Sequence, residues 1–561
     1  MADFEERADQ LSLNLIDSSL VDGEMFKRAR KKLIAPGAKL LVGPRGTGKT
    51  HLMRYTYLHA LRTPASPLVL YASFNRYLHL EPLLKRSTDA LTRFHSWVLA
   101  KLLLSCFQWL EDANKDVNEL AEHDELYNKA KLSQLVELLE RGSGDELYEE
   151  LGRHLTVDRV THAVRILTSK FSRTRAVLLL DDAALSLSDQ YLAAFFEVFR
   201  LLKAEHVAPK AAVYPGTTQY GPTFHAFHEV EEIPLWLSVE DPDFSRIMGE
   251  IAVRRLAGPE IGEINSDALE LLKYVSFGIP RAFLRLLRAY VETESGTLQQ
   301  KINRITEQQV VLIGAEYDSL KLKVPQFASL VALGRQLFDN AVQAVAAVQS
   351  RNPNSQNIVL GVREERDQGP LIDRMFRFLV EVGLLFPLQA VSHGPGRKYL
   401  RFIPHLAFLL KEGAFREGRK ASVRTLPLIM QQPASKHPVR RDLLSLVGAQ
   451  AAQQIKLDLP PCQNCGAHRL NDSQLFCHNC GERLVAASLF EECMKLPLKK
   501  VPGISQTLIS RVTRETQLRT IGDIYSSQNA SADLQETNYV GPRRAQGIIE
   551  RVTAVIDEFL S

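Results

Sequence analysis

The sequence predicts a multidomain α/β protein in which a domain built on a parallel sheet comes first and smaller modules follow. Three observations indicate this class: a glycine-rich loop between an expected strand and helix, an apolar strand that ends in two acidic residues, and a compact group of four cysteines late in the chain. With 561 residues and 45% hydrophobic composition, the chain is long enough for several packed domains.

Charge and hydropathy narrow the class of protein further. The first residues, MADFEERADQ, are acidic and polar, so they do not resemble a secretory signal, and no apolar run approaches the length of a membrane span. We therefore expect a cytoplasmic protein with no membrane partner. The net charge of +4 is too small to indicate nucleic-acid binding by itself, but residues 391–441 hold eleven Lys or Arg against two acids.

The first motif is the loop GPRGTGKT, which follows the apolar run AKLLV and precedes a helical pattern. It matches G-x-x-x-x-G-K-[ST], so its backbone N–H groups can hold the phosphates of ATP at the start of the helix. Lys49 is expected to reach the β- and γ-phosphates, and the Thr50 hydroxyl to bind Mg²⁺. A chance glycine-rich turn is the alternative. The predicted nucleotide-binding residues of the loop are Gly43, Pro44, Arg45, Gly46, Thr47, Gly48, Lys49 and Thr50.

A second strand is expected in AVLLLDDAALS, where two acidic residues follow a continuous apolar run. Asp181 is predicted to hold Mg²⁺, and Asp182 to orient the attacking water, unless the pair serves only as a turn or helix cap. Further strands are expected in PLVLYASF, KAAVYPGTT and EEIPLWLS. Thr217 follows one of them and is a candidate contact for the γ-phosphate, or simply a turn residue.

The order of these parts, followed by VSFGIPRAFLRLLRAYVE, resembles the AAA+ ATPases over residues 25–315, particularly the origin-recognition type and the STAND signalling ATPases. The resemblance implies a P-loop AAA+ domain with a parallel sheet at residues 1–245, a helical lid at 246–320, and a nucleotide between them. It also implies that Arg281 of the lid lies near the γ-phosphate, which makes Lys49, Asp181, Asp182 and Arg281 the expected catalytic set. Asp182 stands where the AAA+ enzymes usually have glutamate, so we expect slow, regulatory hydrolysis of ATP to ADP and phosphate.

Two features of this first half are not explained by the resemblance. Residues 85–170 are charged and leucine-rich, with helical periodicity, and we expect an all-helical insertion there. An arginine that would reach into a neighbouring subunit is not identifiable: Arg200, Arg246 and Arg254 are candidates, and a surface ion pair is the alternative for each.

After the lid, an amphipathic helix precedes two extended segments joined by SHGPGRK. This arrangement looks like a winged-helix domain, assigned to residues 321–425, and origin-type ATPases carry one at this place. The resemblance implies that Arg397, Lys398 and Arg401 face DNA phosphates, with protein packing as the alternative. Residues 426–460, which are basic and rich in turn formers, are expected to form a linker.

The four cysteines form two C-x₂-C pairs separated by eleven residues, each pair followed by glycine. Four thiolates suit structural Zn²⁺, and so short a segment would take its folding energy from the metal. The spacing therefore predicts a zinc ribbon at residues 461–485. Its predicted Zn²⁺ ligands are Cys462, Cys465, Cys477 and Cys480.

The last segment, residues 490–561, contains the related stretches VPGISQTLISRV and YVGPRRAQGIIERV and is similar to a tandem helix-hairpin-helix domain. The similarity implies that the turns at Gly503 and Gly541 hold DNA backbone phosphates, with Arg543 and Arg544 beside the second turn. Residues 485–561 contain nine basic and nine acidic residues, so protein binding stays open.

Together these parts predict an ATP-dependent DNA-binding switch that uses ATP, Mg²⁺ and Zn²⁺. DNA, partner proteins and a nucleotide-dependent homo-oligomer are the expected partners. The alternative is a STAND-type signalling scaffold whose carboxyl-terminal modules bind protein.

Overall fold

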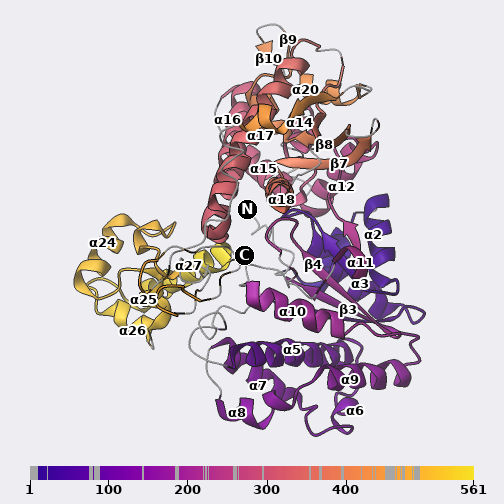
Figure 1. Cartoon of the computed structure of the whole chain (residues 1–561), viewed down its shortest axis with the longest axis vertical. Helices are drawn as coiled ribbons and strands as arrows, with labels where there is room; N and C mark the ends of the chain where they lie inside the picture. Colours follow the sequence, from indigo (N-terminus) through magenta and orange to yellow (C-terminus); the bar gives the residue numbers. More distant parts are fainter. Residues whose placement is uncertain are drawn as a thin grey trace.

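The computed structural model contains three hydrophobic cores, which belong to a sheet domain, a unit that begins with the lid, and a small carboxyl-terminal helical unit (Figure 1). No helix in the described part of the chain has both the length and the apolar character to cross a bilayer. The described residues are 11–21, 23–74, 80, 89–141, 145–182, 189–218, 220, 224, 226–256, 262, 264–293, 296–352, 355–364, 369–392, 394, 397–417, 420–421, 423–432, 434–435, 438–448, 462, 464–467, 469, 474, 476–482, 484, 493–527 and 529–560.

A five-stranded parallel sheet, in the order β2-β3-β4-β1-β5, forms the centre of the first domain and confirms the predicted α/β class. Every residue of β3 and β4 is buried, as expected for central parallel strands. Because β4 pairs with both β1 and β3, the loop after β1 and the acidic end of β3 meet at one edge of the sheet. The strands are β1 Lys39–Val42, β2 Leu68–Ser73, β3 Ala176–Asp181, β4 Val207–Val213 and β5 Glu231–Pro234.

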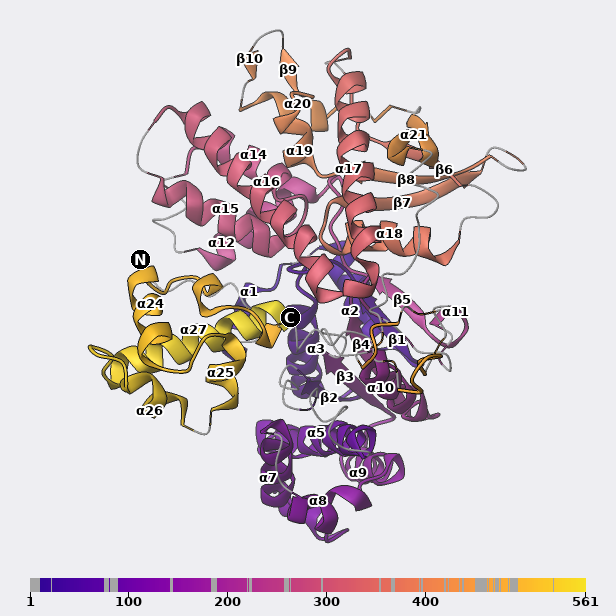
Figure 2. The same ribbon diagram turned by 60° about the vertical axis from the view of Figure 1, so that its left-hand side comes forward.

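Helices surround this sheet, and the chain between β2 and β3 forms a helical excursion below it (Figure 2). Helix α3 packs on β2 and β3. Helix α5 contacts β2, and α7 and α9 pack against α5. The helices of this domain are α1 Leu13–Ser19, α2 Glu24–Ile34, α3 Lys49–Arg62, α5 Ala90–Asp112, α6 Asn118–Ala121, α7 Lys129–Glu140, α8 Asp145–Glu150, α9 Val157–Lys170, α10 Asp189–Leu201 and α11 Ala226–Glu229.

The lid consists of α12 Phe244–Arg255, α14 Ser266–Val275, α15 Pro280–Glu292 and α16 Leu298–Lys323. A tight turn precedes α15, because Phe277 (φ 56) and Gly278 (φ 73) are both left-handed and Pro280 then starts the helix. A Cβ on Gly278 would lie 2.0 Å from the backbone oxygen of Leu237, so only glycine fits there. This contact ties the start of α15 to the segment that follows β5.

The unit after the lid shares its core with the lid helices and contains a second sheet, in the order β11-β6-β8-β7. The expected helix and two extended segments are present, since β7 and β8 form an antiparallel hairpin after α18. The elements are α17 Ala328–Gln349, β6 Leu360–Arg363, α18 Pro370–Glu381, β7 Leu385–Ser392, β8 Lys398–Pro404, α19 Leu406–Lys411, β9 Arg416–Glu417, β10 Lys420–Ala421, α20 Thr425–Met430, β11 Val439–Asp442 and α21 Leu443–Val447.

The prediction of a basic linker at residues 426–460 is wrong for its first half. Helices α20 and α21 and strand β11 lie there, and β11 adds a parallel strand to β6. The segment folds because scattered apolar residues, among them Leu426, Ile429, Leu443 and Leu446, reach the core shared with the lid. These apolar residues are separated by polar and basic ones, so the sequence shows no continuous apolar run from which a helix or strand could be predicted. Residues 449–461 lie outside the described residues.

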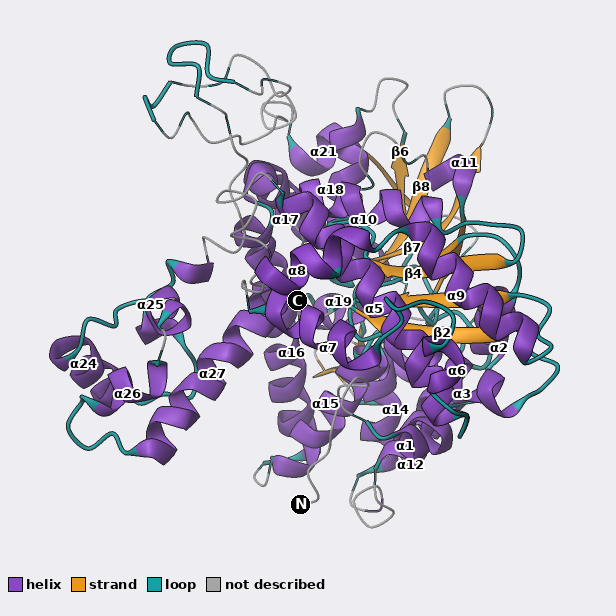
Figure 3. Ribbon diagram, turned by 90° about the horizontal axis from the view of Figure 1, so that it is seen from below, coloured by secondary structure: helices purple, strands orange, loops and turns teal. Residues whose placement is uncertain are grey.

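The carboxyl-terminal unit is all helical and has its own core, and Figure 3 shows it to one side of the other two parts. Its elements are a 3₁₀ turn at Leu498–Lys500, α24 Gln506–Glu515, α25 Ile521–Ser526, α26 Ala530–Gln535 and α27 Pro542–Leu560.

Candidate functional site

The loop that joins β1 to α3 has the backbone geometry that phosphate binding needs. Gly46 (φ 81) and Gly48 (φ 93) are left-handed, a conformation that other residues rarely adopt. Gly43 is required for a different reason, since a Cβ there would lie 2.4 Å from the backbone oxygen of Leu235. Helix α3 begins at Lys49, so its positive end opens onto the loop.

Lys49 is buried beside this loop. Its Nζ donates to two loop carbonyl oxygens, at 2.7 and 3.0 Å, and lies 4.1 Å from the ring centroid of Tyr214. Burial lowers the pKa of Lys49 to about 7, and the carboxylates of Asp181 and Glu381 oppose this shift. A phosphate held by the loop would add an anionic partner that keeps the ammonium charged.

The residues predicted to hold Mg²⁺ lie together. The Thr50 side chain is hydrogen-bonded to the Asp181 carboxylate, and the Tyr71 hydroxyl donates to Asp181 Oδ2 at 2.8 Å. Asp181 is 1% exposed, and this burial raises the pKa of its carboxyl group, while the bonds from Tyr71 and Thr50 act against the rise. Hydroxyl and carboxylate oxygens are the ligands that Mg²⁺ prefers, so this pair fits the ion. Asp182, with φ 53, follows in a strained backbone conformation typical of functional sites.

The turn after β4 is held by a carboxylate from α18. Glu381, which is 1% exposed, accepts hydrogen bonds from the N–H of Gly216 (2.8 Å), the N–H of Thr217 (2.7 Å) and the Thr217 hydroxyl (2.9 Å). Thr217 therefore has a protein partner in this structure, and its contact with a γ-phosphate stays a prediction.

The lid contacts the phosphate-binding loop through Arg281, the lid residue that the sequence analysis predicted to lie near the γ-phosphate. The backbone N–H of Arg281 donates to the carbonyl oxygen of Gly46 at 3.3 Å. Burial raises the pKa of Tyr214, and the positive charges of Arg45 and Arg281 act against that rise. Arg281 thus lies on the same side of the site as Lys49 and its tyrosine neighbour.

Sequence reasoning missed three residues of this site: Tyr71, Tyr214 and Glu381. The first two had a usable signal, because each is a hydrogen-bonding aromatic residue near the carboxyl end of an expected strand. Glu381 had none, because 164 residues separate it from Thr217.

Two of the arginines considered for a neighbouring subunit have partners within this chain. Arg246 forms ion pairs with Asp243 at 3.1 Å and Glu250 at 2.5 Å, and Arg254 donates to the carbonyl oxygen of Ser18 at 3.2 Å. The surface ion pair given as the alternative role for Arg246 is therefore present in this structure.

A cavity of about 220 Å³ lies against α3, beginning one turn after Lys49, between the amino-terminal segment and the first lid helix. It is lined by Asp17, Leu20, Val21, Phe26, Lys27, Arg30, Leu52, Tyr55 and Arg254.

The four predicted Zn²⁺ ligands converge. The sulfurs of Cys462, Cys465, Cys477 and Cys480 lie within 4.8 Å of one another, and the Cys462–Cys480 and Cys465–Cys477 sulfur distances are both 3.5 Å. The two turns are alike: Gly466 (φ 72) and Gly481 (φ 71) are left-handed, and the N–H of each donates to the carbonyl oxygen of the first cysteine of its pair. Four soft sulfurs at this spacing match tetrahedral Zn²⁺, for which a Zn–S length of about 2.3 Å is typical.

Two of the three basic residues predicted at the hairpin of the second sheet have acidic neighbours in this chain. Arg397 is exposed at the hairpin tip, but Lys398 forms an ion pair with Glu364 at 2.7 Å. Arg401 is half-buried in β8, its Nε has no hydrogen-bond partner, and its charge lies near Glu240. That all three face DNA stays a prediction; Arg397 and Lys398 are the exposed residues of the three.

Both predicted hairpin turns of the carboxyl-terminal unit precede helices, α24 and α27. In the first turn Gly503 (φ 75) is the left-handed residue, whereas in the second it is Tyr539 (φ 67), two residues before Gly541. Arg543 and Arg544 are exposed in the first turn of α27, and Arg544 donates to the carbonyl oxygen of Tyr539 at 2.8 Å. Arg544 thus has a structural role as well as the predicted one.

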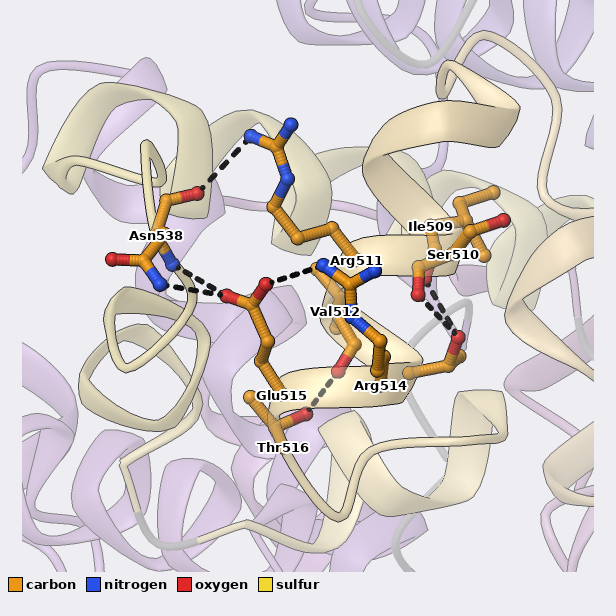
Figure 4. A network of polar contacts seen from close by, with 9 residues as sticks. Ile509, Ser510, Arg511, Val512, Arg514, Glu515, Thr516 and Asn538 are labelled. Atoms are coloured by element: carbon orange, nitrogen blue, oxygen red, sulfur yellow. Dashed lines mark hydrogen bonds and ion pairs between the residues drawn. The ribbon is translucent and has the colours of Figure 1, made fainter.

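The two hairpins brace each other, as Figure 4 shows for one of them. Glu515 of α24 accepts from the backbone N–H and the side-chain amide of Asn538, at 2.9 and 3.2 Å, and Arg511 lies 5.1 Å from the Tyr539 ring. In the other direction, Arg551 of α27 lies against Gly503. Arg511 and Arg551 occupy the same place in ISRV and IERV, so the repeat in the sequence is matched by reciprocal contacts.

One family model matches the stretch of the chain that contains the phosphate-binding loop. Residues 4–78 match a family model described as ORC-CDC6-like, and this stretch contains the phosphate-binding loop. The match confirms the predicted resemblance to origin-recognition-type ATPases. No curated protein matches the chain.

Solved structures give distant likenesses. The Walker-type ATPase PABY2304 of Pyrococcus abyssi is 13% identical, with 70% of this chain and 96% of that chain covered and a TM-score of 0.37. The Aeropyrum pernix ORC1 protein in complex with DNA is 15% identical (71% and 93% covered, TM-score 0.31). The Aeropyrum pernix ORC2 protein in ADPNP–ADP complexes is 12% identical (76% and 99% covered, TM-score 0.31). Likenesses this distant transfer no residue's role to this chain.

Proposed function

We propose that this protein is an ATP-dependent DNA-binding switch, an origin-recognition-like AAA+ ATPase that binds and slowly hydrolyses ATP to control its hold on DNA or its recruitment of partner proteins. One observation carries the proposal: the loop with Lys49, the Thr50–Asp181 pair and the Arg281 segment of the lid meet at one edge of the parallel sheet.

The phosphates of ATP would lie along the loop, where left-handed glycines turn N–H groups toward them and Lys49 supplies a positive charge. The base would enter the cavity beside α3, which is bounded by both the sheet domain and the lid. Arg281 would approach the γ-phosphate from the lid, so the angle between lid and sheet would differ between ATP and ADP.

Thr50 and Asp181 would hold Mg²⁺, which when bound neutralises charge on the phosphates. Asp182 would orient the attacking water. Because aspartate is shorter than the glutamate usual in AAA+ enzymes, Asp182 would hold the water less well, and we expect slow turnover suited to regulation.

Zn²⁺ held by the four cysteines would fold the ribbon and leave no open coordination position for catalysis. Residues after the lid would form a winged helix, with α18 preceding the β7–β8 hairpin as wing, and α24 to α27 would form a tandem helix-hairpin-helix domain. DNA would be held mainly through its backbone, by Arg397 at the wing and by Arg543 at the second hairpin. A nucleotide-dependent homo-oligomer would fit such a switch.

One specific observation favours a second candidate, a STAND-type scaffold whose carboxyl-terminal modules bind protein. Lys398 is paired with Glu364 at 2.7 Å, and the charge of Arg401 acts on Glu240, so two of the three basic residues of the hairpin have acidic neighbours in this chain.

Salt dependence of duplex DNA binding separates these two functions. Arg543→Glu in the full chain should weaken binding equally for all sequences and lower the salt slope by about 1, one lost phosphate contact. Arg153→Glu, which makes the same charge change on an exposed arginine in the 3₁₀ turn Gly152–His154 between α8 and α9, is the control and should leave the slope unchanged. DNA binding with an unaltered slope in Arg543→Glu would favour the scaffold.

A further inference from the structure

Helix α18 lies against the sheet domain at the turn that follows β4, and the fit is close. A Cβ on Gly216 would lie 2.6 Å from Phe378 Cδ1 and 2.9 Å from the Phe378 backbone nitrogen, so glycine is needed for the helix to approach. Three residues further along the helix, Glu381 accepts its three hydrogen bonds from this turn. The contact is therefore both packed and polar.

The same short span also touches the lid just before Arg281. A Cβ on Gly383 would lie 2.8 Å from Ile279 Cδ1, and the Phe386 ring lies 4.7 Å from Trp236 and 6.3 Å from Phe277. Residues 378–386 thus contact both segments that are expected to sense the γ-phosphate, the turn of Thr217 and the start of α15. Strand β7, which leads to the basic hairpin, begins within this span.

Glu381 is a buried carboxylate at the edge of the sheet that holds the phosphate-binding loop, because it binds the turn after β4 and β4 pairs in parallel with β1. A buried anion needs charged or hydrogen-bonding partners, and its donors here are the two N–H groups and the hydroxyl of the β4 turn. A γ-phosphate would bring a second anion to the same turn, where Thr217 is its predicted contact. In a site of low dielectric, two anions cannot both keep these partners without a large cost.

We propose that Glu381 is the positioning residue through which the γ-phosphate acts on the carboxyl-terminal half: it clamps α18 to the β4 turn when ADP or no nucleotide is bound, and ATP releases the clamp. This inference rests on the proposed ATPase function. Release of α18 would free residues 378–386 to shift, and with them the hairpin that carries Arg397. ADP lacks the competing phosphate, so it leaves the clamp closed.

The amides of Gly216 and Thr217 report on the clamp directly, because both donate to Glu381. Hydrogen exchange should be measured at these amides in the full chain with Mg²⁺ and either AMP-PNP or ADP. AMP-PNP should speed exchange at both amides by about tenfold over ADP, as an opened local contact would. Equal exchange with the two nucleotides would overturn the proposal, and this measurement needs no variant.

Glu381→Gln tests the charge while keeping the shape of the side chain. It should raise the affinity for AMP-PNP relative to ADP by about tenfold, because the repelled anion is gone. Glu364→Gln removes a half-buried carboxylate from the same unit, one that pairs with Lys398, and should leave the AMP-PNP to ADP affinity ratio unchanged. An unchanged ratio in Glu381→Gln would overturn the role of its charge.

Nucleotide binding by the wild-type chain and by Lys49→Ala distinguishes a failure of the Glu381 clamp from a failure of the proposed ATPase function. If the wild-type chain binds AMP-PNP and Lys49→Ala does not, the nucleotide site stands, and the Glu381 results decide the clamp alone. If the wild-type chain binds neither nucleotide, the proposed function and the clamp both fail.

Discussion

Replacing Gly46 with alanine tests whether the lid contacts the phosphate-binding loop in solution. Gly46 has φ 81, and an added Cβ would lie 2.8 Å from Arg281 Cβ and 3.1 Å from Ile279 Cγ2. Two effects therefore lower the free energy of unfolding of Gly46→Ala, one from the backbone conformation and one from packing. The left-handed backbone costs about 1–2 kcal/mol with any side chain, and overpacking against the lid costs about 1–3 kcal/mol more.

Gly37 is a matched control, because its φ is 79 and nothing lies within 4 Å of an added Cβ. Gly37→Ala should cost only the backbone term. The free energy of unfolding should thus fall by about 1–3 kcal/mol more in Gly46→Ala than in Gly37→Ala, which is the overpacking term alone.

Urea unfolding followed by tryptophan fluorescence measures this difference. Trp97 and Trp109 lie in the core of the sheet domain, and Trp236 donates to the Phe277 carbonyl oxygen beside the lid turn, so the signal reports the two parts that the contact joins. Gly46→Ala should also bind ATP more weakly than Gly37→Ala, since the lid is held away from the loop. Equal losses of stability in the two variants would mean that the lid does not rest on Gly46, and the reasoning from this contact would be refuted.

Three further predictions follow from other contacts. Lys49→Ala should abolish tight ATP binding because the charge facing the phosphates is lost, whereas Asp182→Asn should bind ATP normally and hydrolyse it at least about tenfold more slowly; isothermal titration and phosphate release separate the two effects. Elemental analysis should find about one Zn²⁺ per chain, Cys477→Ser should release it, and chelation should unfold the ribbon while ATP binding survives; absence of zinc from protein purified without chelator would contradict the assignment. Burial lowers the pKa of Lys210 from its usual 10.5 to about 7, so the unfolded chain binds more protons between these values and stability should rise with pH from about 7 to 10.5; Lys210→Met should flatten that rise in urea titrations at pH 7, 8 and 9.

The parts of the fold that the sequence predicted are those whose pattern is local. The loop after β1 is fixed by glycines that must be left-handed or must approach another backbone, and β3 is fixed by a continuous buried run that ends in Asp181. The cysteine pairs are equally local, because each turn needs only its own glycine and the metal spacing. In each case the chemistry and the secondary structure are specified by the same few residues.

What could not be predicted depends on contacts between distant segments. Glu381 ends an ordinary amphipathic helix, and only the packing of α18 on Gly216 brings it to the turn that follows β4. Strand β11 is equally non-local, since it joins the sheet only through β6, with Val439 opposite Leu360. The residues next to Glu381, or next to β11, do not indicate which distant segment each of them contacts in the fold.

The carboxyl-terminal repeat shows how structure narrows a prediction that the sequence left open. Arg511 and Arg551 are equivalent, and each lies against the turn of the other hairpin, so these two cations are used for bracing. The first turn of α24 is then neutral, with Ser505 as its N-cap, whereas that of α27 carries two arginines, and Arg544 is bonded to Tyr539. Arg543 faces solvent at the positive end of α27, where a bound anion would be stabilising. The second hairpin is therefore the one that places an exposed arginine at a helix start, and a balanced total charge does not argue against a phosphate contact there.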